Sequence, residues 1–284
     1  MNIQQYIFLM VSPDRAGILA AVAETIAACG GDIRDAASFG DEDSGAFFIR
    51  IHLSLGEAGR EAELRTSLAE LTERFAGRSS LRGLARRMRL LVAVSKFDHC
   101  LSDLLNRWQT GSLGADIPLV VSNHEAAREL CEWYKVPFRL VHVDPANKAS
   151  AETEWREIIA EHDIDLVVLA RYMQILSPGF SKELQGRCIN IHHSFLPSFK
   201  GALPYRQAHG RGVKLIGATA HYVTDDLDEG PIIEQDVRRV NHATSAADMQ
   251  LIGREVESSV LARAVRWHIQ HRILLNGTKT VVFS

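Results

Sequence analysis

Apolar and polar residues alternate along the first 86 residues with two periods, one typical of strands and one typical of helices. Apolar runs bounded by turn residues predict strands, at residues 6–11, 33–39, 47–55 and 80–85. Between them, apolar residues recur every three or four positions and predict helices at 14–27 and 61–75. We expect Asp14 to cap the first helix and Gly30 to end it. The order βαββαβ is that of a ferredoxin-like domain.

A second domain is expected over residues 87–284. Residues 90–94 form a continuous apolar run, as in a strand that is covered on both faces of a parallel sheet. Further strands are predicted at residues 117–121, 138–141, 166–170, 189–192 and 216–223, and helices at 100–108, 125–134, 154–161 and 246–275. Strands that alternate with helices predict a doubly wound, mostly parallel α/β domain. Its ligand crevice should lie beyond the carboxyl ends of the strands.

Composition narrows the class of protein. Apolar residues make up 46% of the chain and charged residues 24%, as in soluble globular proteins. A net charge of −3 gives no attraction to nucleic acid or an anionic membrane. No apolar run approaches the roughly 20 residues that span a bilayer, and the run at 6–11 is too short for a signal peptide. Four widely spaced cysteines indicate reduced thiols, so we expect a cytoplasmic protein.

Polar side chains that suit carbonyl chemistry occur at the ends of two apolar strands. In the strand at 189–192, alternation places Asn190 and His192 on the same face. After the strand at 216–223, an acidic loop contains Asp225, Asp226 and Asp228 and is closed by a Gly-Pro pair. Asp228 is the best placed to point inward, although the residues alone leave this open. An amide, an imidazole and a carboxylate can polarise a carbonyl, stabilise an oxyanion and move a proton.

Two spaced motifs resemble a known family. Ile-Asn-Ile-His-x-Ser-x-Leu-Pro begins at Ile189, and His-x-Val-x-x-x-x-Asp-x-Gly-Pro begins at His221. The pair is similar to the formyltetrahydrofolate hydrolase and transferase family, over residues 88–284. The resemblance implies hydrolysis of 10-formyltetrahydrofolate to tetrahydrofolate and formate, a folate substrate and no tightly bound cofactor.

The resemblance also implies roles for individual residues. Asn190 would donate to the formyl oxygen, and His192 would share stabilisation of the oxyanion. Asp228 would hold His192 in its useful charge state and assist proton transfer, with His221 positioning Asp228. A pterin pocket would be lined by Arg171, Met173, Gln174, Ile175, Leu176, Thr224 and Asp225.

Two departures favour water as the formyl acceptor. Family members that transfer the formyl group to glycinamide ribonucleotide have a glycine-rich phosphate loop after the first strand, whereas residues 94–101 here contain no glycine. They also tend to have proline after the motif histidine, where this chain has His193, whose imidazole could orient water. Transfer to an amine acceptor and a catalytically silent folate or amino-acid sensor remain as alternatives.

The N-terminal domain also resembles a known family. The stretch 8–19, Phe-Leu-Met-Val-Ser-Pro-Asp-Arg-Ala-Gly-Ile-Leu, is similar to the ACT family. This resemblance implies an amino-acid effector and a homo-oligomer, a dimer or tetramer; a purely oligomerising role stays equally open. We predict no metal site, because the adjacent His192 and His193 should point to opposite faces of the strand.

Overall fold

The computed structural model describes residues 3–56, 60–197 and 204–284. The chain divides into two compact units, one formed by Met1–Arg87 with Gln270–Ser284 and the other by Met88–Ile269. Within the described ranges, no helix is both long and apolar enough to cross a bilayer.

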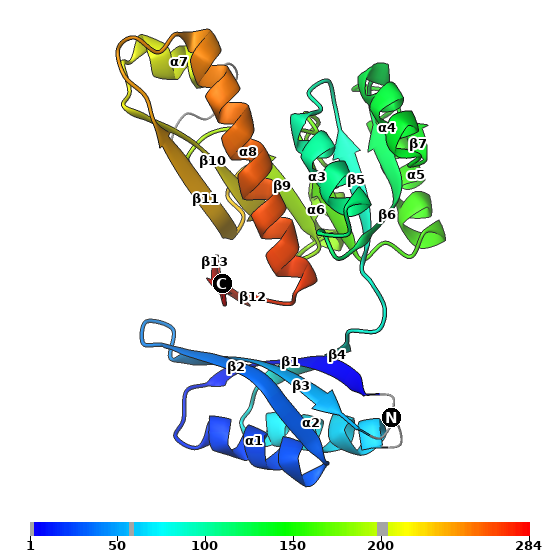
Figure 1. Ribbon diagram of the computed structural model, residues 1–284, viewed down its shortest axis with the longest axis vertical. Helices are drawn as coiled ribbons and strands as arrows, with labels where there is room; N and C mark the ends of the chain where they lie inside the picture. The colour runs from blue at the N-terminus through cyan, green and yellow to red at the C-terminus, as the bar shows by residue number, and fades with distance from the viewer. Residues whose placement is uncertain (1–2, 57–59, 198–203) are drawn as a thin grey trace. The chain divides into compact units, whose positions relative to one another are not determined.

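The first unit is ferredoxin-like, as predicted (Figure 1). Its antiparallel sheet has the strand order β2-β3-β1-β4, and α1 and α2 cover one face. The elements are β1 (Gln4–Pro13), α1 (Ile18–Ala28), β2 (Gly31–Asp41), β3 (Ala46–Leu55), α2 (Glu61–Arg74) and β4 (Arg78–Gly83). Phe8, Val22 and Leu64 from three of these elements meet in one buried cluster.

The start of α1 differs from the prediction. Gly17, not Asp14, occupies the N-cap position, with φ 90° and no side-chain cap bond. Asp14 lies too far upstream to reach the first turn; instead its backbone N–H donates to the Gly45 carbonyl at 2.8 Å. Gly30 follows the end of the helix with φ 75°, in the left-handed region that glycine enters without steric cost, as predicted.

The last fifteen residues group with the first unit, whereas the sequence analysis assigned them to the second domain. They form the hairpin β12 (Ile273–Asn276) and β13 (Lys279–Val282), where a continuation of the helix to residue 275 was predicted. Arg50, which is 5% exposed, donates to the carbonyls of Gln270 and His271 at 3.1 Å each. The two turn residues of the hairpin are Gly277 and Thr278, and Gly277 has φ 59°, in the left-handed region that such turns require.

The second unit is the predicted doubly wound α/β domain. Its seven-stranded sheet has the order β11-β10-β9-β8-β5-β6-β7, parallel from β9 to β7, with β10 and β11 antiparallel. The strands are β5 (Arg89–Val94), β6 (Asp116–Ser122), β7 (Phe138–Leu140), β8 (Leu166–Leu169), β9 (Cys188–His192), β10 (Leu215–Tyr222) and β11 (Ile232–Arg239). The chain order reverses between β5 and β8, and such a switch point opens a crevice at the strand carboxyl ends.

Helices cover both faces of this sheet (Figure 1). They are α3 (His99–Gln109), the short 3₁₀ helix η2 (Glu125–Ala127), α4 (Arg128–Tyr134), α5 (Lys148–Glu161), α6 (Pro178–Glu183), α7 (Pro204–Gly210) and α8 (Ala246–Ile269). Trp155 of α5 and Phe180 of α6 pack with Leu91 of β5 in one buried cluster. The four cysteines are free and buried.

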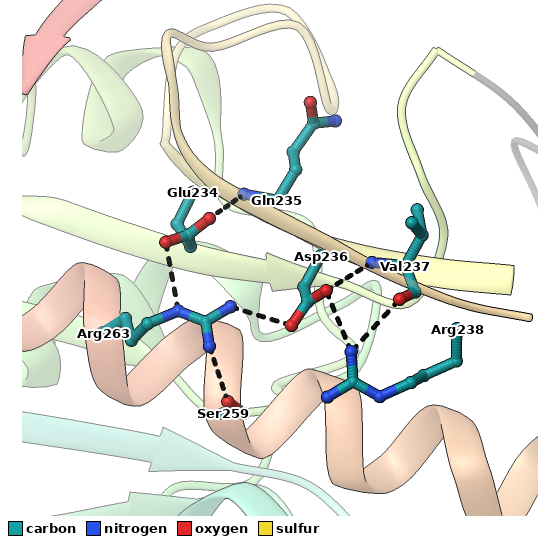
Figure 2. Close-up of polar contacts among 7 residues, drawn as sticks. All are labelled: Glu234, Gln235, Asp236, Val237, Arg238, Ser259 and Arg263. Atoms are coloured by element: carbon teal, nitrogen blue, oxygen red, sulfur yellow. Dashed lines mark hydrogen bonds and ion pairs between the residues drawn. The ribbon is translucent and has the colours of Figure 1, made fainter.

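Helix α8 packs on β9, β10 and β11. Figure 2 shows Arg263 of α8 reaching two acids of β11: its guanidinium lies 3.1 Å from Glu234 and 3.1 Å from Asp236. The same group donates to Ser259 at 2.9 Å, which fixes its direction along the helix. These contacts hold α8 in register with the sheet, so its residues lie at fixed positions beside the ends of β9 and β10.

Candidate active site

A cavity of about 980 Å³ lies in the second unit, at the carboxyl ends of β8 and β9. Its wall contains every site residue that the sequence analysis named: Arg171, Met173, Gln174, Ile175, Leu176, Asn190, His192, His193, His221, Thr224, Asp225 and Asp228. Segments between residues 171 and 228 therefore meet at one place.

Asn190 is oriented by His221. Its Nδ2 lies 3.2 Å from Nε2 of His221, and Nδ1 of His221 lies 2.9 Å from the Tyr222 carbonyl oxygen. A carbonyl only accepts, so Nδ1 carries the proton and Nε2 accepts from the Asn190 amide. The described residues provide no other partner for this amide, so its second N–H can serve a ligand in the cavity.

Asp228 points inward, as predicted, and contacts the motif histidine. Its Oδ2 lies 3.2 Å from Nδ1 of His192, and its Oδ1 lies 3.7 Å from Nε2 of His221. Burial alone would raise the pKa of the Asp228 carboxyl, but opposing interactions, first among them the hydrogen bond from His192, outweigh burial and hold this pKa well below its usual range. The carboxylate is thus ionised at neutral pH, and Nε2 of His192 is buried with no hydrogen-bond partner among the described residues.

The loop that carries Asp228 is closed tightly against β10. Asp228 itself has φ 58°, a left-handed conformation that turns its side chain back toward the strand ends. Two residues later, a Cβ added to Gly230 would stand 1.7 Å from the Tyr222 carbonyl oxygen. The Tyr222 N–H donates to the Pro231 carbonyl at 3.0 Å. Only glycine allows this approach, so the Gly-Pro pair sets the position of the carboxylate.

His193 differs from its prediction. Strand β9 ends at His192, so the expected alternation does not continue, and the rings of His192 and His193 lie 5.1 Å apart at 31°. Burial, with Arg171 and His192 nearby, lowers the pKa of His193 to about 4. The cavity therefore contains a neutral imidazole beside the His192–Asp228 pair.

The segment after β8 forms an apolar wall. Met173 and Ile175 are 54% and 60% exposed yet line the cavity, whereas Leu176 packs partly against the core. Ser95 holds the segment by accepting from the Met173 N–H at 2.9 Å and donating its own N–H to the Arg171 carbonyl at 3.3 Å. Exposed apolar side chains in a cavity wall suit a flat ligand.

Comparison with known proteins identifies the family of this domain. A family model described as formyl transferase matches residues 88–265. The chain belongs to the formyl transferase family. The family resemblance carried by the two motifs is therefore confirmed.

Individual members of the formyl transferase family match to different extents. The formyltetrahydrofolate deformylase of Bacillus subtilis (strain 168) is 46% identical over 279 residues, which are 97% of this chain and 93% of that protein. The structure of a formyltetrahydrofolate deformylase from Pseudomonas syringae pv. tomato covers 100% of this chain and 96% of its own, at 44% identity and TM-score 0.95. A phosphoribosylglycinamide formyltransferase from Anaplasma phagocytophilum, at 30% identity and TM-score 0.64, covers 96% of its own chain but 70% of this one.

The formyl transferase domain also contains a buried acid that the sequence analysis missed. Glu257 of α8 is 1% exposed and accepts from Nε2 of His99 at 2.8 Å and from the Tyr205 hydroxyl at 2.6 Å. Burial would raise the pKa of Glu257, but His99 and Arg171 outweigh it and keep this pKa low. The sequence pattern that could have identified Glu257 is its spacing. It lies at helical spacing between Gly253 and Val260, on the buried face of α8.

One group in the domain has potential metal ligands. Among the described residues, donor atoms of His99, Cys100 and Glu257 lie within 4.8 Å of one another. Arg171 Nε stands 3.4 Å from Glu257, and burial raises the pKa of the Cys100 thiol well above its usual range. A neighbouring guanidinium and a protonated thiol both oppose cation binding, so we assign no metal to this group.

Proposed function

We propose that this protein hydrolyses 10-formyltetrahydrofolate to tetrahydrofolate and formate. The observation that carries the proposal is the meeting of Asn190, His192 and Asp228 at one cavity, with His192 and Asp228 3.2 Å apart. The names of the full-length relatives support the same reaction.

Asn190 and His192 would act on the formyl oxygen. Attack of water on the formyl carbon moves the carbonyl electron pair onto this oxygen. The free N–H of Asn190 and the Nε2–H of His192 then stabilise the oxyanion. Ionised Asp228 accepts from Nδ1 of His192 and thereby fixes the orientation of the imidazole.

Asp228 would also pass the proton. When the intermediate collapses, the carbonyl reforms and the bond from carbon to N10 breaks. Asp228 takes up one proton of the attacking water and delivers it to N10, which leaves as the neutral amine of tetrahydrofolate. The other product, formic acid, loses its remaining proton to solvent and leaves as formate. Because the pKa of Asp228 is low, its carboxylate is ionised at neutral pH and is in the state that can accept this proton.

The apolar wall would bind the pterin. Met173, Ile175 and Leu227, which is 59% exposed, offer apolar surface to the cavity. Flat heterocycles bind best to such surfaces when a few polar groups at the edge fix their orientation. Gln174, Thr224 and Asp225 line the same cavity and can supply these groups.

An assay without any amine acceptor tests whether water accepts the formyl group. We expect purified protein to convert 10-formyltetrahydrofolate to equal amounts of formate and tetrahydrofolate. Asn190→Ala and Asp228→Asn should each lower turnover about 10²-fold or more, whereas the control Glu229→Gln, an exposed neighbour outside the cavity wall, should not. Release only with an added amine would indicate a transferase, and no release a silent binding protein.

The first unit would regulate or assemble the enzyme. It has the ferredoxin-like fold expected from the ACT resemblance, and β2 forms one edge of its sheet with Phe39 46% exposed. An exposed edge strand can pair with a second copy, so we propose a homo-oligomer, with an amino acid as effector. Sedimentation and a titration with single amino acids test both parts. The four free cysteines fit a cytoplasmic location.

A further inference from the structure

Arg171 has hydrogen-bonding capacity that the described residues do not use. It follows β8, lines the cavity and is 9% exposed. Its Nε and Nη1 are buried and have no hydrogen-bond partner in the described part of the chain. Unsatisfied buried donors are rare and costly, and they often mark the place of a ligand, an ion or an ordered water.

Glu257 balances the charge of Arg171 but leaves hydrogen-bond donors of the guanidinium without an acceptor. Its Oε2 lies 3.4 Å from Arg171 Nε but is taken by His99 at 2.8 Å. The other oxygen is taken by the Tyr205 hydroxyl at 2.6 Å. The carboxylate is therefore held in place by other donors, and the guanidinium keeps donors for a further acceptor.

Arg171 lines the same cavity as the proposed catalytic residues. Its guanidinium carbon is 5.7 Å from the centre of the Phe97 ring, and Arg254 lies 5.3 Å from the same ring. Burial and then Arg171 are the main causes that lower the pKa of His193. His193 in turn lies against His192. Arg171 and His193 therefore line the same cavity, and the guanidinium is close enough to the imidazole to act on its charge.

We propose that Arg171 forms a subsite for a planar carboxylate, and that the formate released by hydrolysis occupies it. The proposal rests on the proposed function for the identity of this ligand. A guanidinium presents parallel N–H donors whose spacing matches the two oxygens of a carboxylate. The glutamate carboxylates of the folate are the other source, but the p-aminobenzoyl ring separates them from the formyl nitrogen. A subsite beside His193 therefore fits formate.

Binding of formate to the free protein tests the subsite without turnover. Carbon-13 formate is titrated and followed by NMR in the full-length protein and in Arg171→Gln, Arg171→Lys and Arg254→Gln. We expect the Arg171→Gln and Arg171→Lys changes each to weaken formate binding about tenfold or more, because neither side chain offers the charged planar fork. Arg254→Gln removes the same charge from the cavity wall and should change binding by less than about threefold. Arg171→Lys keeps a cation beside the buried Glu257. The subsite can therefore be tested with this variant if Arg171→Gln does not fold.

Other results would overturn the subsite. If Arg171→Gln and Arg254→Gln weaken formate binding equally, the binding reflects general electrostatic attraction and not a subsite at Arg171. Absence of formate binding in a protein that hydrolyses the folate would remove the subsite and leave the proposed function intact. Displacement of formate by p-aminobenzoylglutamate would reassign Arg171 to the folate tail. Formate binding that depends on Arg171 in a protein without hydrolysis would refute the proposed function and support the carboxylate subsite.

Discussion

Replacing Gly230 with alanine should displace the carboxylate that the proposed reaction needs. The added Cβ would stand 1.7 Å from the Tyr222 carbonyl oxygen, whereas carbon atoms in proteins approach to about 3.5–4.0 Å. The loop must therefore move away from β10 by roughly 2 Å. Such a movement breaks the bond from the Tyr222 N–H to Pro231 and the 3.2 Å contact between His192 and Asp228.

Gly230→Ala should lower both the stability of the protein and its rate of turnover. Overpacking and one lost backbone hydrogen bond together should lower the free energy of unfolding by about 2–4 kcal/mol. A misplacement of this size should lower kcat about 10²-fold or more. Urea unfolding followed by tryptophan fluorescence reports the second unit, which contains all four tryptophans.

A matched glycine serves as the control for this prediction. Gly179 of α6 is exposed, and an added Cβ there would meet nothing within 4 Å. Gly179→Ala should therefore leave formate release unchanged and be neutral or stabilising by about 0.5–1 kcal/mol. Wild-type stability and activity in Gly230→Ala would show that the loop closure does not set the position of Asp228.

Three further changes test other parts of the structure. Arg263→Met should lower the free energy of unfolding by about 1–2 kcal/mol in urea, since it removes two partly exposed ion pairs between α8 and β11; no change would mean that these pairs do not fix the helix. His193 has a folded pKa of about 4 against an ordinary 6.5, so the unfolded chain binds its proton first as pH falls. The free energy of unfolding should therefore fall between pH 6.5 and pH 4, by up to about 3 kcal/mol. The fall between pH 7 and pH 5 should be smaller in His193→Gln. An equal fall in the two proteins would show that His193 takes up its proton as readily in the folded protein as in the unfolded chain. Arg50→Ala should lower the Tm by several degrees, about 1–3 kcal/mol, because it removes the two hydrogen bonds from the buried guanidinium to the carbonyls of Gln270 and His271. An unchanged Tm in differential scanning calorimetry would show that the hairpin is held by other contacts.

The sequence could predict those parts of the site that depend on local geometry. Strand alternation places Asn190 and His192 on one face, and the order of elements places them at the carboxyl edge of the sheet. The same reasoning failed at His193, because this residue lies one position beyond the strand. It also failed at residues 270–275, because the hairpin turn at Gly277 was not weighed against helical spacing.

Contacts between distant segments were beyond prediction from one sequence. The partners of Glu257 lie in α3, in the segment after β8 and in α7, so no local sequence pattern predicts these contacts. The inward direction of Asp228 likewise depends on its left-handed backbone and on the close approach at Gly230. Both features arise from tertiary packing of loops whose sequence alone allows several conformations.

Hydrolysis in oxygen-18 water tests the central claim most directly, namely that water attacks a formyl group held by Asn190, His192 and Asp228. With 10-formyltetrahydrofolate and no amine acceptor, mass spectrometry should find one labelled oxygen in each formate released by the wild-type protein. Asp228→Asn should release formate with the same label at a rate about 10²-fold lower or more. Formate without label, or labelled formate released as fast by Asp228→Asn as by the wild type, would contradict the account.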